Sequence, residues 1–355
     1  MSRFLSKEFR TLKPYTPGEQ PKVVGKLIKL NTNENPYPPS PAALRVLDDK
    51  ELNKLRLYPD PEASDLVEAI AEFYGIKSDQ VMVGNGSDEI LAFCFMAFRN
   101  EENNVFYPEI SYSFYPVYCD IFHIEGVKVP LDEEFRVVPS YYYHAGGTIV
   151  ITNPNAPTGI ALTVAEIRSI LENNRENVVV IDEAYVDFGA ESAVTLIDEY
   201  DNLVVVQTLS KSRSLAGARV GFAMGNRELI ADLNRLKFSF NPYNLNRLSI
   251  IAGIEAIKDV EYFERTSRLI ANTREIFVRD MERLGFSVLP SKSNFVFVRS
   301  NLISGEEYFT SLRKYNIIVR YFKDPKISDY VRITIGTPED MKALVDATRE
   351  ILSNR

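Results

Sequence analysis

The sequence predicts an α/β fold with a large domain on a mostly parallel, doubly wound sheet and a smaller α+β domain. The chain of 355 residues is long enough for two domains of ordinary size. From residue 80 onward, short runs rich in β-branched residues alternate with amphipathic stretches, and after about residue 260 this alternation stops. The first pattern is typical of βαβ units and the second is not, so we expect a domain boundary near residue 260.

The strands and helices of the large domain are predicted in order along the chain. "QVMVG" precedes the helical stretch "SDEILAFCFMAF", "NVFY" precedes "SYSFYPVYCDIF", and "GTIVIT" precedes "TVAEIRSILENN". Two more strands follow, "NVVVID" and "NLVVVQT". Strands that are apolar without alternation are buried on both faces, as in parallel sheets covered by helices. Thr163 and Glu166 have the spacing of a capping box, so the third of these helices is expected to begin there.

The small domain is predicted from one long amphipathic helix, "EYFERTSRLIANTREIFVRDMERLG", followed by the strands "SNFVFV", "NIIVR" and "YVRITIG". A last helix should begin with Thr337 as its cap and Pro338 as its first residue. The first thirty residues contain three prolines and are expected to form an arm that packs elsewhere. We therefore predict an arm over residues 1–30, a large domain over 31–260 and a small domain over 261–355.

Composition excludes several classes of function. Lys plus Arg total 41 against 49 for Asp plus Glu, a net charge of −8, so no field attracts the protein to nucleic acid or to an anionic membrane. No run of about 18 apolar residues predicts a membrane span, and the first residues do not resemble a signal peptide, so we expect a cytoplasmic protein. With two cysteines and two histidines, the sequence provides too few ligands for a zinc site and too little material for a Ser-His-Asp triad.

Polar clusters follow four of the predicted strands: "GNGSDE", "NPNAPTG", "DEAY" and "TLSKS". Ligands of open parallel sheets bind beyond the carboxyl ends of the strands, so these clusters predict one site. In "GNGSDE", Gly86 is followed by Ser87 and Asp88 in the first turn of a helix, where free backbone N–H groups can hold a phosphate. The same stretch is also compatible with an ordinary strand-to-helix turn capped by Ser87.

Asp182 ends the apolar strand "VVVID", and Lys211 follows the strand "NLVVVQT". A buried carboxylate must be paired or functional, so Asp182 is either a structural ion pair or a site residue. A lysine in a cleft can be neutral and can form a Schiff base with an aldehyde, although most lysines are simply solvated. Together with a phosphate cradle, the two residues meet the requirements of pyridoxal phosphate, which needs a phosphate anchor, an anion beside its ring nitrogen and an amine.

On these motifs the sequence resembles the class I/II aminotransferase family of fold-type I pyridoxal-phosphate enzymes. The resemblance covers nearly the whole chain, and its motifs occur in the expected order: "LKPYTPG", "KLNTNENPYPPSP", "RLYPDP", "GNGSDEIL", "NPNAPTG", "VIDEAYVDF", "TLSKSRSLAGARVGF", "IIVR" and "YVRITIGT". It implies pyridoxal 5'-phosphate as cofactor, with Lys211 bound to its aldehyde and Asp182 beside its ring nitrogen. Tyr185 would donate to the ring hydroxyl, and Tyr112 would stack on the ring.

The same resemblance implies roles for the other site residues. The phosphate would be surrounded by Gly86, Ser87, Asp88, Ser210 and Arg219. Tyr58 of "RLYPDP" would reach the phosphate from a second subunit, which implies a homodimer with shared sites. Substrate contacts would come from Tyr15, Asn35, Arg320 and Arg332.

The loop "NPNAPTG" departs from the family pattern. The family usually has Asn directly before Pro-Thr-Gly, where it contacts the ring oxygen of the cofactor, and this sequence has Ala156 there. We expect Asn155, one residue earlier, to provide that contact instead.

The resemblance implies transamination between L-histidinol phosphate and 2-oxoglutarate, giving imidazole-acetol phosphate and glutamate. Two other reactions on the same architecture stay open at this point, the decarboxylation of threonine phosphate and the transamination of aromatic amino acids. A transcription regulator with an aminotransferase-like domain would need a DNA-binding module, and about 30 residues without a basic helical pair precede the first site motif.

Overall fold

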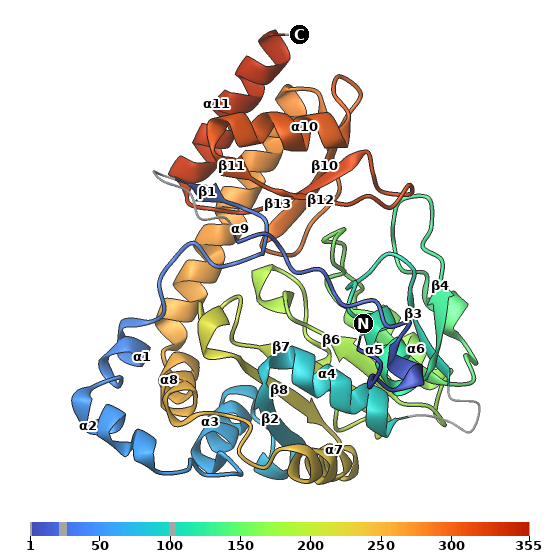
Figure 1. Cartoon of the computed structure of the whole chain (residues 1–355), viewed down its shortest axis with the longest axis vertical. Coiled ribbons are helices and arrows are strands. Elements are labelled where there is room, and N and C mark those ends of the chain that lie inside the picture. The colour runs from blue at the N-terminus through green and yellow to red at the C-terminus, as the bar shows by residue number, and fades with distance from the viewer. Residues whose placement is uncertain (1, 21–26, 99–103, 355) are drawn as a thin grey trace.

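A seven-stranded sheet forms the centre of the large domain in this computed structural model, which describes residues 2–20, 27–98 and 104–354 (Figure 1). Its strand order is β2-β8-β7-β6-β5-β3-β4, and the strands from β7 to β4 are parallel. β8 runs antiparallel to both of its neighbours, β2 and β7. The strands are β2 (Val81–Asn85), β3 (Asn104–Pro108), β4 (Glu125–Val129), β5 (Thr148–Thr152), β6 (Val179–Asp182), β7 (Leu203–Thr208) and β8 (Val220–Gly225). The predicted α/β class and mostly parallel sheet are confirmed.

Helices cover both faces of this sheet because its strands are apolar on both sides. On β7, Val205 belongs to one buried core and Val204 and Val206 to another, and β5 and β6 alternate in the same way. One core lies under α3, α6 and α8, and the other under α4, α5 and α7. The helices of the large domain are α1 (Pro41–Arg45), α2 (Asp49–Leu52), α3 (Ser64–Tyr74), α4 (Gly86–Ala97), α5 (Tyr115–Phe122), α6 (Val164–Glu172), α7 (Arg227–Phe240) and α8 (Arg247–Lys258).

The small domain packs four antiparallel strands against three helices, as Figure 1 shows above the large sheet. The sheet order is β12-β13-β10-β9, with β9 (Phe286–Val288), β10 (Phe295–Ser300), β12 (Arg320–Tyr321) and β13 (Tyr330–Thr334). The helices are α9 (Val260–Arg283), α10 (Gly305–Leu312) and α11 (Pro338–Ser353). Helix α9 extends from the edge of the large domain into the small one.

Two helix starts agree with the capping residues read from the sequence. The Thr163 hydroxyl accepts the backbone N–H of Glu166, and the Glu166 carboxylate accepts the N–H of Thr163, so α6 begins with a full capping box. Helix α11 begins after Thr337 with Pro338 at its first position.

The predicted boundary between arm and large domain lies inside a segment that belongs to the small domain. β1 (Ile28–Lys29) pairs in parallel with β11 (Ile317–Ile318), and Leu30 is buried in the core of the small domain. The predicted strand "NIIVR" is split, since β11 pairs with β1 while β12 joins the four-stranded sheet. Part of the predicted arm, residues 21–26, lies outside the described residues.

No helix among the described residues is both long enough and apolar enough to cross a membrane.

Candidate active site

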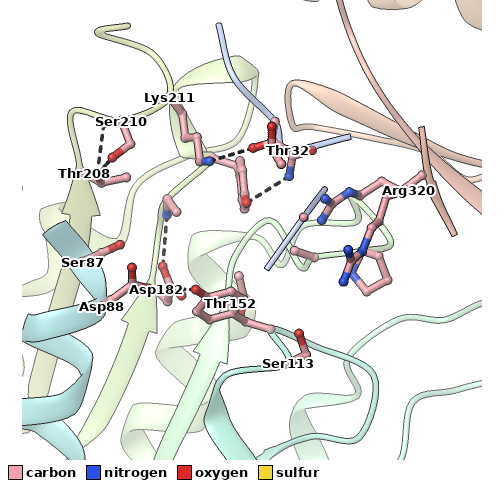
Figure 2. Close-up of a pocket in the computed structure, with 18 of the residues that line it drawn as sticks. Thr32, Ser87, Asp88, Ser113, Thr152, Asp182, Thr208, Ser210, Lys211 and Arg320 are labelled. Carbon is pink, nitrogen blue, oxygen red and sulfur yellow. Dashed lines mark hydrogen bonds between the residues drawn. The ribbon is translucent and has the colours of Figure 1, made fainter. Parts of the chain in front are cut away.

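A cavity of about 190 Å³ lies between the two domains, where the carboxyl ends of three parallel strands meet. Thr152 ends β5, Asp182 ends β6 and Thr208 ends β7, and all three line the cavity. Figure 2 shows Ser87, Asp88 and Ser210 on one side of it and Arg320 on the opposite side. The polar clusters that the sequence places at this sheet edge therefore do line one cavity.

One end of the cavity is built by the N-terminus of α4. Ser87 and Asp88 lie in its first turn and line the cavity, where the orphan N–H groups and the helix dipole favour an anion. Gly86 has φ +79°, and a Cβ there would lie 2.4 Å from Arg219 Nη2. Gly221 on β8 is equally confined, because its Cβ would lie 2.3 Å from the backbone nitrogen of Ser87. The two glycines thus let Arg219 and β8 approach the helix start.

Asp88 holds the groups around this helix start in place. Its carboxylate accepts hydrogen bonds from Arg219 Nη2 at 2.8 Å and from the Tyr112 hydroxyl at 2.8 Å. Arg219 has φ +55°, a conformation that costs free energy for a residue with a Cβ. Ser210 is close by on the next strand end, where its hydroxyl accepts from Thr208 Oγ1 at 2.8 Å. A guanidinium, two hydroxyls and free N–H groups therefore face the same end of the cavity.

Asp182 is buried at the floor of the cavity. Its carboxylate accepts the Tyr115 hydroxyl at 2.9 Å and the backbone N–H of Ala184 at 3.2 Å. Burial raises its pKa to about 6, while these two hydrogen bonds oppose the rise. Within the part of the chain that the structure describes, no Arg or Lys side chain forms an ion pair with Asp182, so the structural ion pair considered from the sequence is not what holds it.

Lys211 approaches the cavity from the loop after β7. Its Nζ donates to the carbonyl oxygen of Thr32 at 3.2 Å, as the dashed line in Figure 2 shows. Burial lowers its pKa to about 8, and the positive charge of Arg332 adds to that effect. An amine with this pKa is partly neutral near physiological pH, which an ordinary solvated lysine is not.

The two arginines of the small domain meet on neighbouring strands. Arg320 and Arg332 are directly opposite each other in the β12–β13 pairing, and both line the cavity. Arg320 Nη2 lies 3.4 Å from the carbonyl oxygen of Thr16, and Arg332 Nη2 donates to that of Asn31 at 2.9 Å. Burial lowers the pKa of Arg332, and its Nε has no hydrogen-bond partner. Two adjacent guanidinium groups with spare donors form a site for an anion.

Aromatic side chains close the cavity between these two ends. The Tyr15 ring lies 6.2 Å from the Tyr112 ring and 5.0 Å from that of Phe114, centroid to centroid. Tyr185 is buried on the small-domain side, and its ring packs edge-on against Phe295 at 5.0 Å. Tyr15, Tyr112 and Tyr185 all line the cavity, as their predicted roles require.

Four predicted site residues, Gly86, Asn155, Asn35 and Tyr58, lie outside this cavity lining. Gly86 is confined beside Arg219 at the start of α4. Asn155 faces away, with its amide donating to the carbonyl of Ile110 at 2.9 Å and to Thr158, while Ala156 lines the cavity in its place. The expectation that Asn155 provides the missing contact therefore has no support from its position. Asn35 donates to the carbonyl of Lys211 at 2.9 Å, so it holds the lysine loop from behind.

Tyr58 is the last of these residues, and it does not line the cavity of its own chain. It is 78% exposed, and its ring stacks on that of Tyr243 at a centroid distance of 4.6 Å. An exposed ring in this position is available to a second chain.

Two residues that hold side chains of the site were missed in the sequence. Tyr115 holds Asp182 and also bonds Thr152, and Asn33 donates to the Tyr185 hydroxyl at 3.0 Å. Tyr115 occurs in "SYSFYPVY" among other aromatic residues, and nothing in the pattern distinguishes it from them. Asn33 occurs in "NTNENP", where several asparagines are equally plausible candidates. Only the tertiary structure selects these side chains.

Comparisons with known proteins agree with this geometry. The chain is 52% identical to histidinol-phosphate aminotransferase of Brachyspira hyodysenteriae over 100% of both proteins. It is 50% identical to histidinol-phosphate aminotransferase 1 of Hydrogenovibrio crunogenus, over 100% of this chain and 99% of that protein. The crystal structure of histidinol-phosphate aminotransferase from Sinorhizobium meliloti in complex with pyridoxal-5'-phosphate has a TM-score of 0.86 at 21% identity, covering 100% of this chain and 99% of that one.

The family assignment rests on the extent of the match as well as on the site. Residues 25–347 match the model of the family described as aminotransferase class I and II. This range contains the strand-end clusters, Lys211 and both cavity arginines. The chain belongs to the aminotransferase class I and II family.

Proposed function

We propose that this chain is a pyridoxal-phosphate-dependent transaminase that transfers the amino group of L-histidinol phosphate to 2-oxoglutarate. The observation that carries the proposal is a single cavity that joins an anion cradle, a desolvated lysine, a buried carboxylate and two arginines. Relatives about 50% identical over the full length are named histidinol-phosphate aminotransferase, which supports this substrate over others for the same fold.

The residues present fit pyridoxal phosphate. The start of α4 is kept open by Gly86 and Gly221, where any Cβ would collide with its neighbours, and the space beside it faces Arg219. Asp182 would face its ring nitrogen, and Lys211 would reach its aldehyde. When bound, the cofactor supplies that aldehyde for condensation with amines and a ring that withdraws electrons. Ser87, Asp88, Ser210 and Arg219 would hold its phosphate.

Lys211 serves as nucleophile and as proton carrier in this proposal. Its lowered pKa gives a neutral amine at moderate pH, which is the reactive form of a lysine. The same Nζ can accept a proton at one substrate carbon and return it at another atom within reach, since it moves on a flexible four-carbon chain.

Asp182 would supply negative charge at the far side of the site. Tyr115 and the N–H of Ala184 orient its two oxygens, so the carboxylate does not need to reorganise during the reaction. Its raised pKa of about 6 means that the charge is present at neutral pH and is lost in acid.

The two arginines would take the anionic group of each substrate in turn. Arg320 and Arg332 are adjacent across β12 and β13, and guanidinium groups bind phosphate and carboxylate in the same bidentate manner. A phosphorylated amine and a dicarboxylic acid can therefore share one site, as a two-substrate transaminase requires. Tyr15 lines the same cavity and would cover the bound substrate.

A homodimer with shared sites is the assembly we infer. Tyr58 is exposed and stacks on the exposed Tyr243, and the exposed side chains of Leu52, Leu55 and Leu57 lie just before it in sequence. Exposed apolar patches mark protein–protein contacts. A second copy covering it would bring its own Tyr58 toward the anion cradle of this chain.

We also infer a cytoplasmic location. Cys94 and Cys119 are both free and buried, and burial raises the pKa of each thiol. Unpaired thiols are the usual state in a reducing compartment.

The experiment that tests the proposed function is a panel of amino donors at fixed 2-oxoglutarate, with glutamate and carbon dioxide both measured. L-histidinol phosphate should give glutamate, while histidinol without its phosphate should be poor because the arginines lose their partner. Each lost charge-assisted contact corresponds to about tenfold to a hundredfold in rate at low substrate. Equal turnover of phenylalanine or tyrosine would favour an aromatic aminotransferase, and carbon dioxide from threonine phosphate would favour a decarboxylase.

A further inference from the structure

Asn33 forms a direct hydrogen bond to the Tyr185 hydroxyl inside the cavity wall. Its Nδ2 lies 3.0 Å from Tyr185 Oη, and both residues are buried. Both also line the cavity described above. The hydroxyl that faces the bound cofactor in the proposed function therefore already has one partner from the protein.

Asn33 is fixed by the small domain rather than by the large one. Its backbone N–H donates to Thr334 Oγ1 at 3.0 Å, and its carbonyl accepts Asn294 Nδ2 at 3.0 Å. Three residues before Asn33 in the chain, the Leu30 carbonyl accepts the backbone N–H of Thr334 at 3.0 Å. Asn33 has φ +56°, a left-handed conformation that asparagine tolerates better than most residues. With its backbone held by these contacts, the Asn33 side chain points toward Tyr185.

The network also fixes which atom of the amide faces the tyrosine. The Thr334 hydroxyl donates to Asn33 Oδ1 at 3.0 Å, so the oxygen of the amide faces Thr334 and the nitrogen faces Tyr185. Tyr185 Oη thus accepts a hydrogen bond, and its own proton is free to point into the cavity. Accepting one hydrogen bond polarises a hydroxyl and strengthens the bond that it donates.

We propose that Asn33 is a positioning residue: it orients the hydroxyl proton of Tyr185 toward the cofactor ring oxygen. Because the small domain holds Asn33, the orientation of this hydroxyl depends on the small domain. The inference rests on the proposed function and deepens it. Thr334 lies on β13 two residues from Arg332, so the strand that carries the anion-binding arginine also holds Asn33 in place. The side chain of Ala156, which lines the same cavity, has no hydrogen-bond donor. Asn33 is the side-chain amide that contacts Tyr185.

Charge around Tyr185 supports the same reading. Burial raises the pKa of Tyr185, and Arg332 and the Asn33 hydrogen bond oppose that rise, while Asp182 and Asp88 add to it. The Lys211 ammonium lies 5.7 Å from the centre of the Tyr185 ring. Loss of the Asn33 donor would make the Tyr185 hydroxyl a weaker donor without removing it.

The test is a double-mutant cycle on the pH midpoint of the visible absorption of the bound cofactor. Tyr185→Phe removes a donor to the ring oxygen and should raise this midpoint by roughly half to one pH unit, the equivalent of one neutral hydrogen bond. Asn33→Gly, which suits the left-handed backbone, should raise it by a smaller amount. The combination of both changes should equal Tyr185→Phe alone, because Asn33 acts only through the tyrosine.

Asn31→Ala is the matched control, because its amide donates to the carbonyl of Glu19 and not to Tyr185. Its effect should add to that of Tyr185→Phe. If Asn33→Gly does not fold, Thr334→Val removes the hydroxyl that orients the amide and should shift the midpoint in the same direction. An unchanged midpoint in whichever of Asn33→Gly and Thr334→Val folds would overturn this inference but not the proposed function. Additive shifts for Asn33→Gly and Tyr185→Phe would do the same. A wild-type protein that gains no visible absorption from pyridoxal phosphate would overturn the proposed function as well.

Discussion

Lys211 is placed where its amine is both accessible and poorly solvated. The loop after β7 brings it to the cavity, and Asn35 holds that loop through hydrogen bonds to the carbonyls of Lys211 and Ser212. Burial lowers its pKa to about 8, the positive charge of Arg332 lowers it as well, and Asp88 and Glu34 act in the opposite direction. A shift in this direction favours the neutral amine, which is the form that attacks a carbonyl.

This pKa predicts how fast the cofactor-free protein captures pyridoxal phosphate at different pH. At pH 7 only roughly a tenth of a lysine with a pKa of about 8 is neutral, and above pH 9 most of it is. The rate of covalent capture, followed by visible absorption, should rise about tenfold between pH 7 and 9 and then level off. Continued growth of the rate up to pH 10 would show an ordinary solvated lysine, and Lys211→Ala is the control that should capture nothing covalently.

Residue types at strand ends were enough to predict most of the candidate site. Asp182, Ser87, Asp88, Ser210 and Lys211 all follow strands of one parallel sheet, and the geometry of such a sheet brings them together. The amide of Asn155 could not be placed from sequence, because a small turn decides whether it faces the cavity or the carbonyl of Ile110. The partners Tyr115 and Asn33 depend on contacts across more than 60 residues of sequence.

At the scale of elements, Arg213 joins the lysine loop to two helices. Its guanidinium donates to the carbonyls of Ala256 at 2.7 Å and Ile257 at 3.4 Å, near the C-terminal end of α8. It also lies 3.5 Å from the centre of the Phe263 ring on α9. A cation in this position binds carbonyl groups that the helix leaves without partners and stacks on an aromatic face.

Arg213→Met should lower the free energy of unfolding by about 2–4 kcal/mol, because buried carbonyls and the carboxylate of Asp187 lose a positive partner. The measurement is denaturant unfolding of the purified protein. Arg268→Met is the matched control: its side chain is 69% exposed and its ion pair with Glu264 should be worth less than about 1 kcal/mol. Equal losses for the two variants would show that the contacts of Arg213 are not stabilising.

Physical reasons explain why the strands β8 and β1 were not predicted from the sequence. β8 contains Gly221 and Gly225, which weaken the apolar pattern of a strand, yet a side chain at Gly221 would collide with Ser87. β1 is two residues long, and its pairing with β11 is a contact between opposite ends of the chain. Capping residues, by contrast, are local signals, and those at Thr163 and Thr337 gave correct helix starts.

At the scale of the whole molecule, three parts of the chain form the cavity. The large sheet contributes Asp182 and Lys211, the small domain contributes Arg320 and Arg332, and the N-terminal segment contributes Tyr15. Figure 1 shows the N-terminal segment running along the boundary between the two domains. In the proposed dimer, Tyr58 of a second copy would be the fourth contribution.

Shared sites predict complementation between inactive chains. Lys211→Ala protein and Tyr58→Phe protein, mixed under conditions where subunits exchange, should form heterodimers with one site that has both native residues. Glutamate formation should then exceed the sum of the two parents. A mixture of Lys211→Ala with the Lys211→Ala, Tyr58→Phe double variant is the control and should gain nothing. Exchange without any gain in the first mixture would contradict a role for Tyr58 across the interface.

The most direct measurement of the central claim is the rate of glutamate formation from L-histidinol phosphate and 2-oxoglutarate, compared between wild type and Lys211→Ala at saturating pyridoxal phosphate. The account predicts steady turnover by the wild type and a rate lower by on the order of 10³-fold or more in the variant, since both nucleophile and proton carrier are lost. A wild type without turnover, or a variant with a similar rate, would contradict it.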